Sequence, residues 1–183
     1  MSRMKRKQPV TIDDMYHMPK DGRKYELVDG EVVVSPAGMR HSEIAIKIIR
    51  IVATYLDNTP IGKIYGDNTG VILPNGNLRS PDVFVVRNEK LPDGKSPITF
   101  GELVPDFVVE VLSPGDRQGQ VAQKIGEFLE YGVPIVWLVD PEDDSVTVYR
   151  SLSQTQRFTS IDIIDAEPVL PGFSCQVSRF FPA

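Results

Sequence analysis

The clearest pattern in the chain is the strand-like segment Asp106–Leu112, an apolar run interrupted by Glu110. Alternation along a strand places Glu110 on the same face as Val108 and Leu112, whose side chains favour burial. A Ser-Pro-Gly-Asp turn and a helical pattern follow. A buried carboxylate costs on the order of several kcal/mol unless something compensates it. Residues 105–124 therefore predict a strand, a turn and a helix arranged around a compensated acid.

The remaining periodicities predict further helices and strands. Lys24–Val28 and Glu31–Val34 are strand-like runs separated by Asp29-Gly30, which is typical of a two-residue hairpin turn. Apolar residues at three- and four-residue steps predict a long helix from Gly38 to Asp57. The other expected elements are a helix at 12–17, strands at 63–66, 69–73 and 78–87, a loop at 88–102, a helix at 117–131 with Gly132 as its cap, strands at 135–139 and 145–149, short strands within 157–173 and a turn at 178–181.

This order of elements predicts the fold class α/β (α+β), with a mixed central β-sheet flanked by helices. We expect a basic, flexible N-terminal tail at 1–10 and a single domain at 11–183. The strand at 135–139 is nearly all apolar, as in a sheet covered on both faces, and we expect its Trp137 in the core.

The amino-acid composition limits the metal sites and binding partners that the chain can have. The 183 residues include one cysteine and two histidines, so an internal disulfide and a cysteine- or histidine-rich metal site are excluded. Any metal would be a hard cation bound by carboxylates, Mg²⁺ or Mn²⁺. The net charge of −5 argues against a uniformly basic nucleic-acid binder but permits a local basic patch. We find no membrane-spanning run and no signal-peptide core, and we expect a cytoplasmic location.

Two more acids lie on strand faces that favour burial. Asp82 shares a face with Phe84 and Val86, and Glu26 shares a face with Val28. Each acid taken alone is readily explained as a salt-bridged or partly exposed residue. Three such acids in one domain also indicate a shared purpose, and alternation by itself leaves both interpretations open.

Lys124 and His41 also have two possible interpretations each. Lys124 lies at the edge of the apolar stripe of its helix, from which a lysine can extend along the sheet toward a carboxylate. The alternative is a solvated lysine paired with Glu127 or Glu130. His41, near the start of the long helix, is interpreted as a capping or surface residue or as one that faces the cleft. The candidates for phosphate contacts are Arg40, Lys47, Arg79 and Arg87.

The order of these motifs resembles that of the PD-(D/E)XK nuclease superfamily, in Pro81-Asp82, Glu110-Val111-Leu112 and Lys124. The chain is similar, more closely, to the restriction-endonuclease-like group called the Uma-two family. That similarity runs from about Thr11 to Tyr149. The motifs that carry it are Tyr25–Gly30, Ser80–Asp82, Pro105–Pro114, Lys124 and Tyr131–Pro141.

The resemblance implies a restriction-endonuclease-like fold and a metal-dependent endonuclease that hydrolyses DNA. Asp82 and Glu110 would bind Mg²⁺ or Mn²⁺, and Glu26 would be an accessory acid. The superfamily's lysine normally follows the second acid by two positions, where this chain has Leu112. The resemblance implies that a lysine on the next helix replaces the usual one, and Lys124 lies at such a position. It would steady the attacking hydroxide or the charge that develops on the phosphate.

Other functions remain open at this level. A non-catalytic binding or assembly module could keep the fold, and the Leu112 replacement and the acidic net charge favour it somewhat. Hydrolysis of RNA or of a smaller phosphodiester would use the same site. Apolar stretches and the isoleucine-rich helix also suggest a homodimer.

Overall fold

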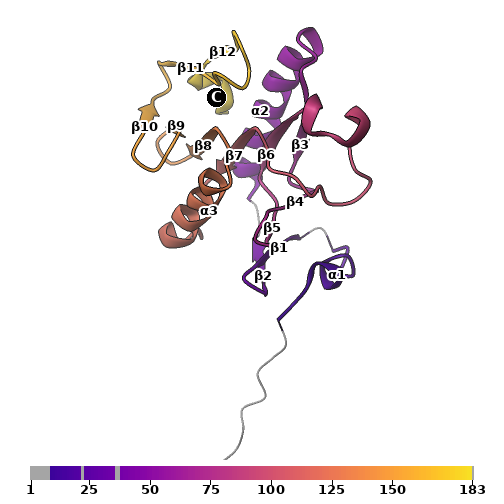
Figure 1. The fold of residues 1–183 in the computed structure, drawn as a ribbon. Coiled ribbons are helices and arrows are strands. Elements are labelled where there is room, and N and C mark those ends of the chain that lie inside the picture. The colour runs from indigo at the N-terminus through magenta and orange to yellow at the C-terminus, as the bar shows by residue number, and fades with distance from the viewer. Residues whose placement is uncertain (1–8, 22, 36–37, 183) are drawn as a thin grey trace, which may run out of the picture.

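A computed structural model describes residues 9–21, 23–35 and 38–182, and it contains two main sheets (Figure 1). The larger sheet has strand order β10-β9-β8-β7-β6-β3, and the smaller has order β2-β1-β5-β4. The strands are β1 (Lys24–Val28), β2 (Glu31–Ser35), β3 (Gly62–Gly66), β4 (Val71–Ile72), β5 (Leu78–Arg79), β6 (Val83–Arg87), β7 (Phe107–Val111), β8 (Ile135–Asp140), β9 (Ser145–Tyr149), β10 (Thr155–Phe158), β11 (Ile163–Asp165) and β12 (Ser174–Gln176). The helices are α1 (Ile12–Met15), α2 (Met39–Asn58) and α3 (Gln118–Glu130), with 3-10 turns η1 (Asn88–Lys90), η2 (Pro92–Gly94) and η3 (Val177–Phe180).

The larger sheet is mixed, as expected from the sequence. β7 pairs antiparallel with β6 and parallel with β8. The parallel pair needs a crossover connection, and α3 supplies it. Gly132 ends α3 with a φ of +90°. The amide of Gly132 donates to Leu129 and that of Val133 donates to Phe128, the two hydrogen bonds of a Schellman cap. The predicted cap is thus confirmed, and it directs the chain into β8.

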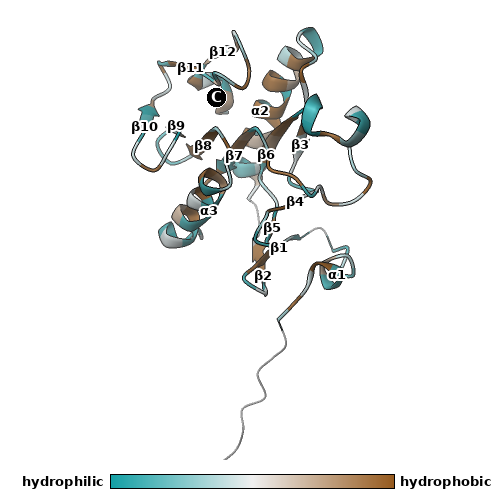
Figure 2. Cartoon of the chain, in the orientation of Figure 1, coloured by the Kyte–Doolittle hydropathy of each residue, from teal (hydrophilic) through white to brown (hydrophobic). Residues whose placement is uncertain are grey.

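Helices cover both faces of this sheet. One face packs against α2 and the C-terminal segment, where Trp137 is fully buried as predicted. The other face packs against α3, through Phe84 and Val108 on the sheet and Phe128 on the helix. Figure 2 shows the central strands as hydrophobic and α3 as divided between an apolar and a polar side. The strand that carries Glu110 is therefore covered on both faces.

The predicted hairpin is present. Tyr25 pairs with Val34 and Leu27 with Val32, so the register leaves Asp29 and Gly30 as the two-residue turn. Both turn residues have positive φ, +51° and +79°, which a type I′ turn requires. β1 also pairs with β5, so the hairpin belongs to the smaller sheet.

The prediction of one continuous strand from Leu78 to Arg87 is wrong. The chain forms β5 in the smaller sheet and β6 in the larger sheet, with Ser80-Pro81-Asp82 between them. Proline has no amide hydrogen to donate to a ladder, which favours a break at this point. The break places Asp82 at the junction of the two sheets.

The other predicted elements differ from the observed ones mainly at their ends. The first helix is shorter, at Ile12–Met15, and Thr11 with Asp14 forms its capping box. The strand predicted at 69–73 is reduced to Val71–Ile72. The basic run at residues 3–7 and most of the predicted tail lie outside the described residues.

Candidate active site

Two carboxylates lie opposite each other on neighbouring strands. β6 and β7 are antiparallel, with Val83 opposite Val109 and Phe84 opposite Val108. The same register, continued by one residue, places Asp82 opposite Glu110, on the face that α3 covers. Both acids line one pocket. The strands therefore bring together the two acids that the resemblance assigns to the metal.

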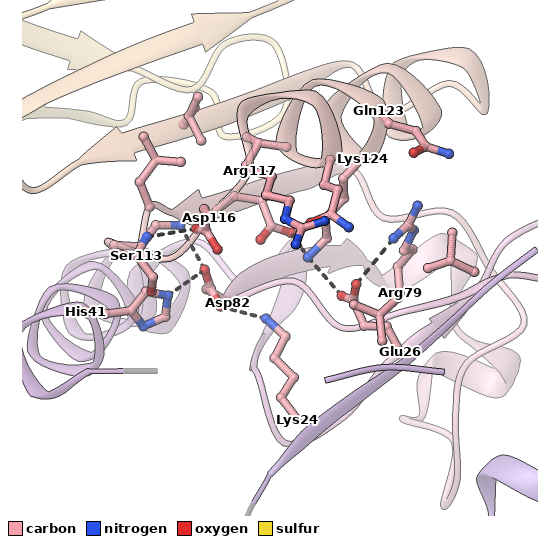
Figure 3. A pocket seen from close by; sticks show the side chains of 18 residues that line it. Lys24, Glu26, His41, Arg79, Asp82, Ser113, Asp116, Arg117, Gln123 and Lys124 are labelled. Carbon is pink, nitrogen blue, oxygen red and sulfur yellow. Dashed lines mark hydrogen bonds and ion pairs between the residues drawn. The ribbon is translucent and has the colours of Figure 1, made fainter. Parts of the chain in front are cut away.

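Asp82 is a buried anion with hydrogen-bond partners on both carboxylate oxygens (Figure 3). Its Oδ1 accepts from Lys24 Nζ at 2.7 Å. Its Oδ2 is 3.0 Å from His41 Nε2 and accepts from the amide of Val111 at 2.8 Å. Burial raises the pKa of Asp82, but the hydrogen bond from His41 and the charge of Lys24 outweigh it, and the pKa lies well below its ordinary value. Since the carboxylate can only accept, His41 Nε2 is the donor.

Lys124 extends from α3 into the same pocket. Its Nζ lies 2.8 Å from Glu26 Oε1 and 2.7 Å from Glu110 Oε1. Burial lowers the pKa of Lys124, but the two carboxylates outweigh it, so the pKa lies above its ordinary value and the ammonium stays charged. The alternative of a solvated lysine paired with Glu127 or Glu130 is wrong.

Glu110 is the least compensated acid of the cluster. The Lys124 ammonium forms an ion pair with Oε1 at 2.7 Å, and this oxygen has no further hydrogen-bond partner among the described residues. Burial raises the pKa of Glu110 to about 7, although Lys124 acts in the opposite direction. Burial therefore opposes the ionised form of this carboxyl, and the Lys124 ammonium offsets that effect only in part.

Glu26 reaches the pocket from the smaller sheet. Its Oε1 accepts from the amide of Ser80 at 2.8 Å, and its Oε2 lies 3.3 Å from Arg79. Burial raises the pKa of Glu26, but Lys124 and Lys24 outweigh it and the pKa lies below its ordinary value. Glu26 is thus an anion that pairs with Lys124, as Glu110 does.

Arg79 pairs with Glu26 and is itself held by a second buried acid, Glu127. Its Nε donates to Glu127 Oε2 at 2.5 Å. Asn75 and Asn77 each donate to Glu127 Oε1 at 2.6 Å. Arg79, one of the four candidates for phosphate contacts, is buried and paired with Glu26 and Glu127, which argues against that role.

His41 and Lys24 complete the cluster. The interpretation of His41 as a capping or surface residue is wrong, and the alternative, that it faces the cleft, is confirmed. Its helical spacing from Ile44, Ala45 and Ile48 could have placed it on the buried stripe. Lys24 was not predicted, although strand alternation puts it on the face of Glu26.

The pocket is small and adjoins a larger groove. Its cavity volume is about 140 Å³, and Leu112 forms part of its wall. The groove has a volume of about 770 Å³ and shares His41, Leu112 and Asp116 with the pocket. A lysine at position 112 would enter this pocket from the end of β7, whereas Lys124 enters it from α3.

The fold and the cluster together define a restriction-endonuclease-like protein in which a lysine from a helix stands beside the strand-borne acids. The chain belongs to the Uma2 family, described as "Putative restriction endonuclease", which matches residues 12–178. The resemblance identified in the sequence is confirmed.

A solved structure supports the same fold. The chain is similar to a "putative nuclease belonging to DUF820" from Anabaena variabilis ATCC 29413, with a TM-score of 0.83 and 21% sequence identity. The alignment covers 94% of this chain and 98% of that one. The predicted fold class is thus confirmed. Comparison with curated proteins gave no match. Among the described residues, no helix is both long and apolar enough to cross a bilayer.

Proposed function

We propose that this protein is a metal-dependent endonuclease that hydrolyses phosphodiester bonds of DNA through Asp82, Glu110 and Lys124. The observation that carries the proposal is the position of Lys124, whose ammonium lies 2.7 Å from Glu110 and 2.8 Å from Glu26. A lysine from α3 thereby reaches the acid beside which the superfamily's lysine normally stands. Leu112, at the usual lysine position, is uncharged and cannot stabilise an anion.

The residues present fit Mg²⁺ or Mn²⁺. Asp82 and Glu110 offer hard oxygen ligands, and the cavity of about 140 Å³ has room for several water molecules. Within the part of the chain that the structure describes, no group of three or more His, Cys, Asp or Glu side chains is arranged to hold a metal ion. Two carboxylates completed by water and substrate phosphate are nonetheless a common Mg²⁺ environment. When bound, such a cation polarises a phosphoryl oxygen and acidifies a water molecule.

The side chains then take separate roles. Asp82 and Glu110 bind the cation, and Lys124 stabilises the negative charge that develops on the phosphate. Glu26 is the accessory acid that fixes the Lys124 ammonium. The adjoining groove of about 770 Å³ leaves space for the nucleotides on either side of the cleaved bond. A homodimer, which would place two such sites on a duplex, stays a prediction.

Plasmid cleavage tests the proposal. Supercoiled plasmid is incubated with the protein in Mg²⁺ or Mn²⁺, and nicked and linear products are measured against time. We expect cleavage by the wild type and a loss of about a hundredfold or more in an Asp82→Ala/Glu110→Ala variant. Asp144→Asn is the matched control, because Asp144 is an exposed acid paired with Arg40.

Equal and negligible cleavage by the wild type and the double variant would reject DNA as the substrate. A parallel panel of single-stranded DNA, RNA and a small phosphodiester then separates a different substrate from no catalysis at all. The non-catalytic module, favoured by Leu112, predicts no metal-dependent hydrolysis across the whole panel.

A further inference from the structure

Lys24 is a cation of the pocket to which the proposed mechanism assigns no role. It extends from β1 in the smaller sheet, and its Nζ lies 2.7 Å from Asp82 Oδ1. Its side chain is only 11% exposed. Figure 3 shows this side chain pointing toward Asp82. A positive charge therefore already lies against the oxygen that a divalent cation would use.

The two oxygens of Asp82 are held differently. Oδ2 receives two hydrogen bonds, from His41 and from the amide of Val111, whereas Oδ1 receives one, from Lys24. If Lys24 leaves, the contacts on Oδ2 still fix the orientation of the carboxylate. Oδ1 is thus the oxygen that becomes available when a single contact breaks.

Lys124 offers no equivalent exchange. Its ammonium bridges two carboxylates, those of Glu26 and Glu110, so its departure breaks two ion pairs. Glu110 would then be left in a buried position without a cation, which is strongly unfavourable. Exchange at Lys24 disturbs the cluster less.

We propose that Lys24 occupies the cation position at Asp82 Oδ1 in the metal-free protein and yields it to the divalent cation. The released ammonium then binds a phosphate group of the substrate. This inference rests on the proposed function, because it requires a cation site at Asp82. It assigns Lys24 two successive partners, a carboxylate before the metal binds and a phosphate afterwards.

The charge of the pocket supports this exchange. Its lining carries four Lys or Arg and four Asp or Glu side chains besides His41, so these eight formal charges balance when the acids are ionised. A bound divalent cation makes it positive, and an anionic group then restores neutrality. Lys24 would contribute to that attraction only after it leaves Asp82. The metal and a phosphate should consequently bind with positive coupling.

Manganese binding tests the first half of the exchange. Free Mn²⁺ is measured by electron paramagnetic resonance during titration of the wild type, Lys24→Met, Lys24→Arg and Lys95→Met. Lys95→Met is the matched control, because Lys95 is an exposed lysine. Removal of the competing charge should tighten Mn²⁺ binding about tenfold or more in Lys24→Met, with little change in Lys95→Met. Lys24→Arg, which keeps a cation beside Asp82, should not bind more tightly than the wild type.

Several outcomes would overturn the inference. If the wild type binds Mn²⁺ at a site lost in Asp82→Asn, and Lys24→Met binds it equally or more weakly, then Lys24 is only a structural ion-pair partner and the proposed function survives. If neither the wild type nor Lys24→Met binds Mn²⁺, both proposals fail. Because a folding defect does not tighten metal binding, thermal unfolding with and without Mn²⁺ provides a second check: Mn²⁺ should stabilise Lys24→Met more than the wild type.

Inorganic phosphate tests the second half. Its affinity is measured by calorimetry with and without saturating Mn²⁺. We expect Mn²⁺ to tighten phosphate binding to the wild type by about tenfold and to have a smaller effect on Lys24→Met. Equal tightening in both proteins would show that the released ammonium does not reach the phosphate.

Discussion

Asp82 and Glu110 lie opposite each other on β6 and β7 and face the same helix, yet their surroundings differ in kind. Asp82 is held by Lys24, His41 and a backbone amide, and its pKa lies well below its ordinary value. Glu110 is close to one ammonium among the described residues, that of Lys124, and burial raises its pKa to about 7. One acid is a fixed anion, and the other still gains from a cation.

This difference separates two tasks within one site. Asp82 does not need a metal to remain charged and oriented, because hydrogen bonds do both. Glu110 depends on Lys124 and on whatever else occupies the pocket. Paired acids whose pKa values are driven apart by their surroundings commonly take different roles in catalysis. Under the proposed function, Asp82 would define where the cation binds, and Glu110 would make that binding sensitive to charge.

The largest effect is expected at Lys124, on the Glu110 side of this comparison. Lys124→Met should reduce plasmid cleavage by about 10²- to 10³-fold, because the charge developing on the phosphate loses its cation. The variant should also lose about 3 kcal/mol of unfolding free energy in urea, since two buried carboxylates lose a partner. A Lys124→Met/Glu110→Gln variant should regain part of the stability and none of the activity. Recovered cleavage in that variant would contradict the role of Lys124.

The second prediction compares the two acids directly, through their stability without metal. In EDTA near pH 8, Asp82→Asn should cost about 3 kcal/mol, because buried Lys24 and His41 lose their acceptor. Glu110→Gln should change the unfolding free energy by about 1 kcal/mol or less, since it removes a poorly compensated charge. Urea denaturation measures both, with Asp144→Asn as the control. Equal losses would mean that the two acids are supported alike.

Much of this fold was predictable from local pattern. Asp29-Gly30 fixed the hairpin, Gly132 ended α3, and helical spacing located α2 and α3, because each depends on neighbouring residues. The break at Ser80–Asp82 was not predicted. Whether β5 and β6 continue as one strand depends on which sheet each joins, and that is set by contacts with β1 and β7, far away in sequence.

The site was predictable to a similar extent. Alternation and family resemblance selected Glu26, Asp82, Glu110 and Lys124, which the pocket brings together. The partners of Arg79 and Lys24 could not be chosen from the sequence, since the chain offers many acids of equal charge. Both residues extend from the smaller sheet, and only its packing against α3 and β6 decides whether they meet substrate or carboxylate.

The smallest expected effect is a pH dependence that belongs to Glu110. Its pKa in the folded protein, about 7, lies above the ordinary value of 4.5. The stability it contributes is therefore complete below about pH 4.5 and is lost as the pH rises through 7. In EDTA, the wild type should lose stability relative to Glu110→Gln over that interval, by about 1 kcal/mol. Thermal unfolding from about pH 5 to pH 8.5 measures the difference between the two proteins. The raised pKa of His41 largely cancels in this difference, because both proteins share it.

Saturating Mg²⁺ should reverse this pH trend, since the cation binds the ionised carboxyl of Glu110. A difference that does not change with pH, with or without Mg²⁺, would show that Glu110 is as firmly ionised as Asp82.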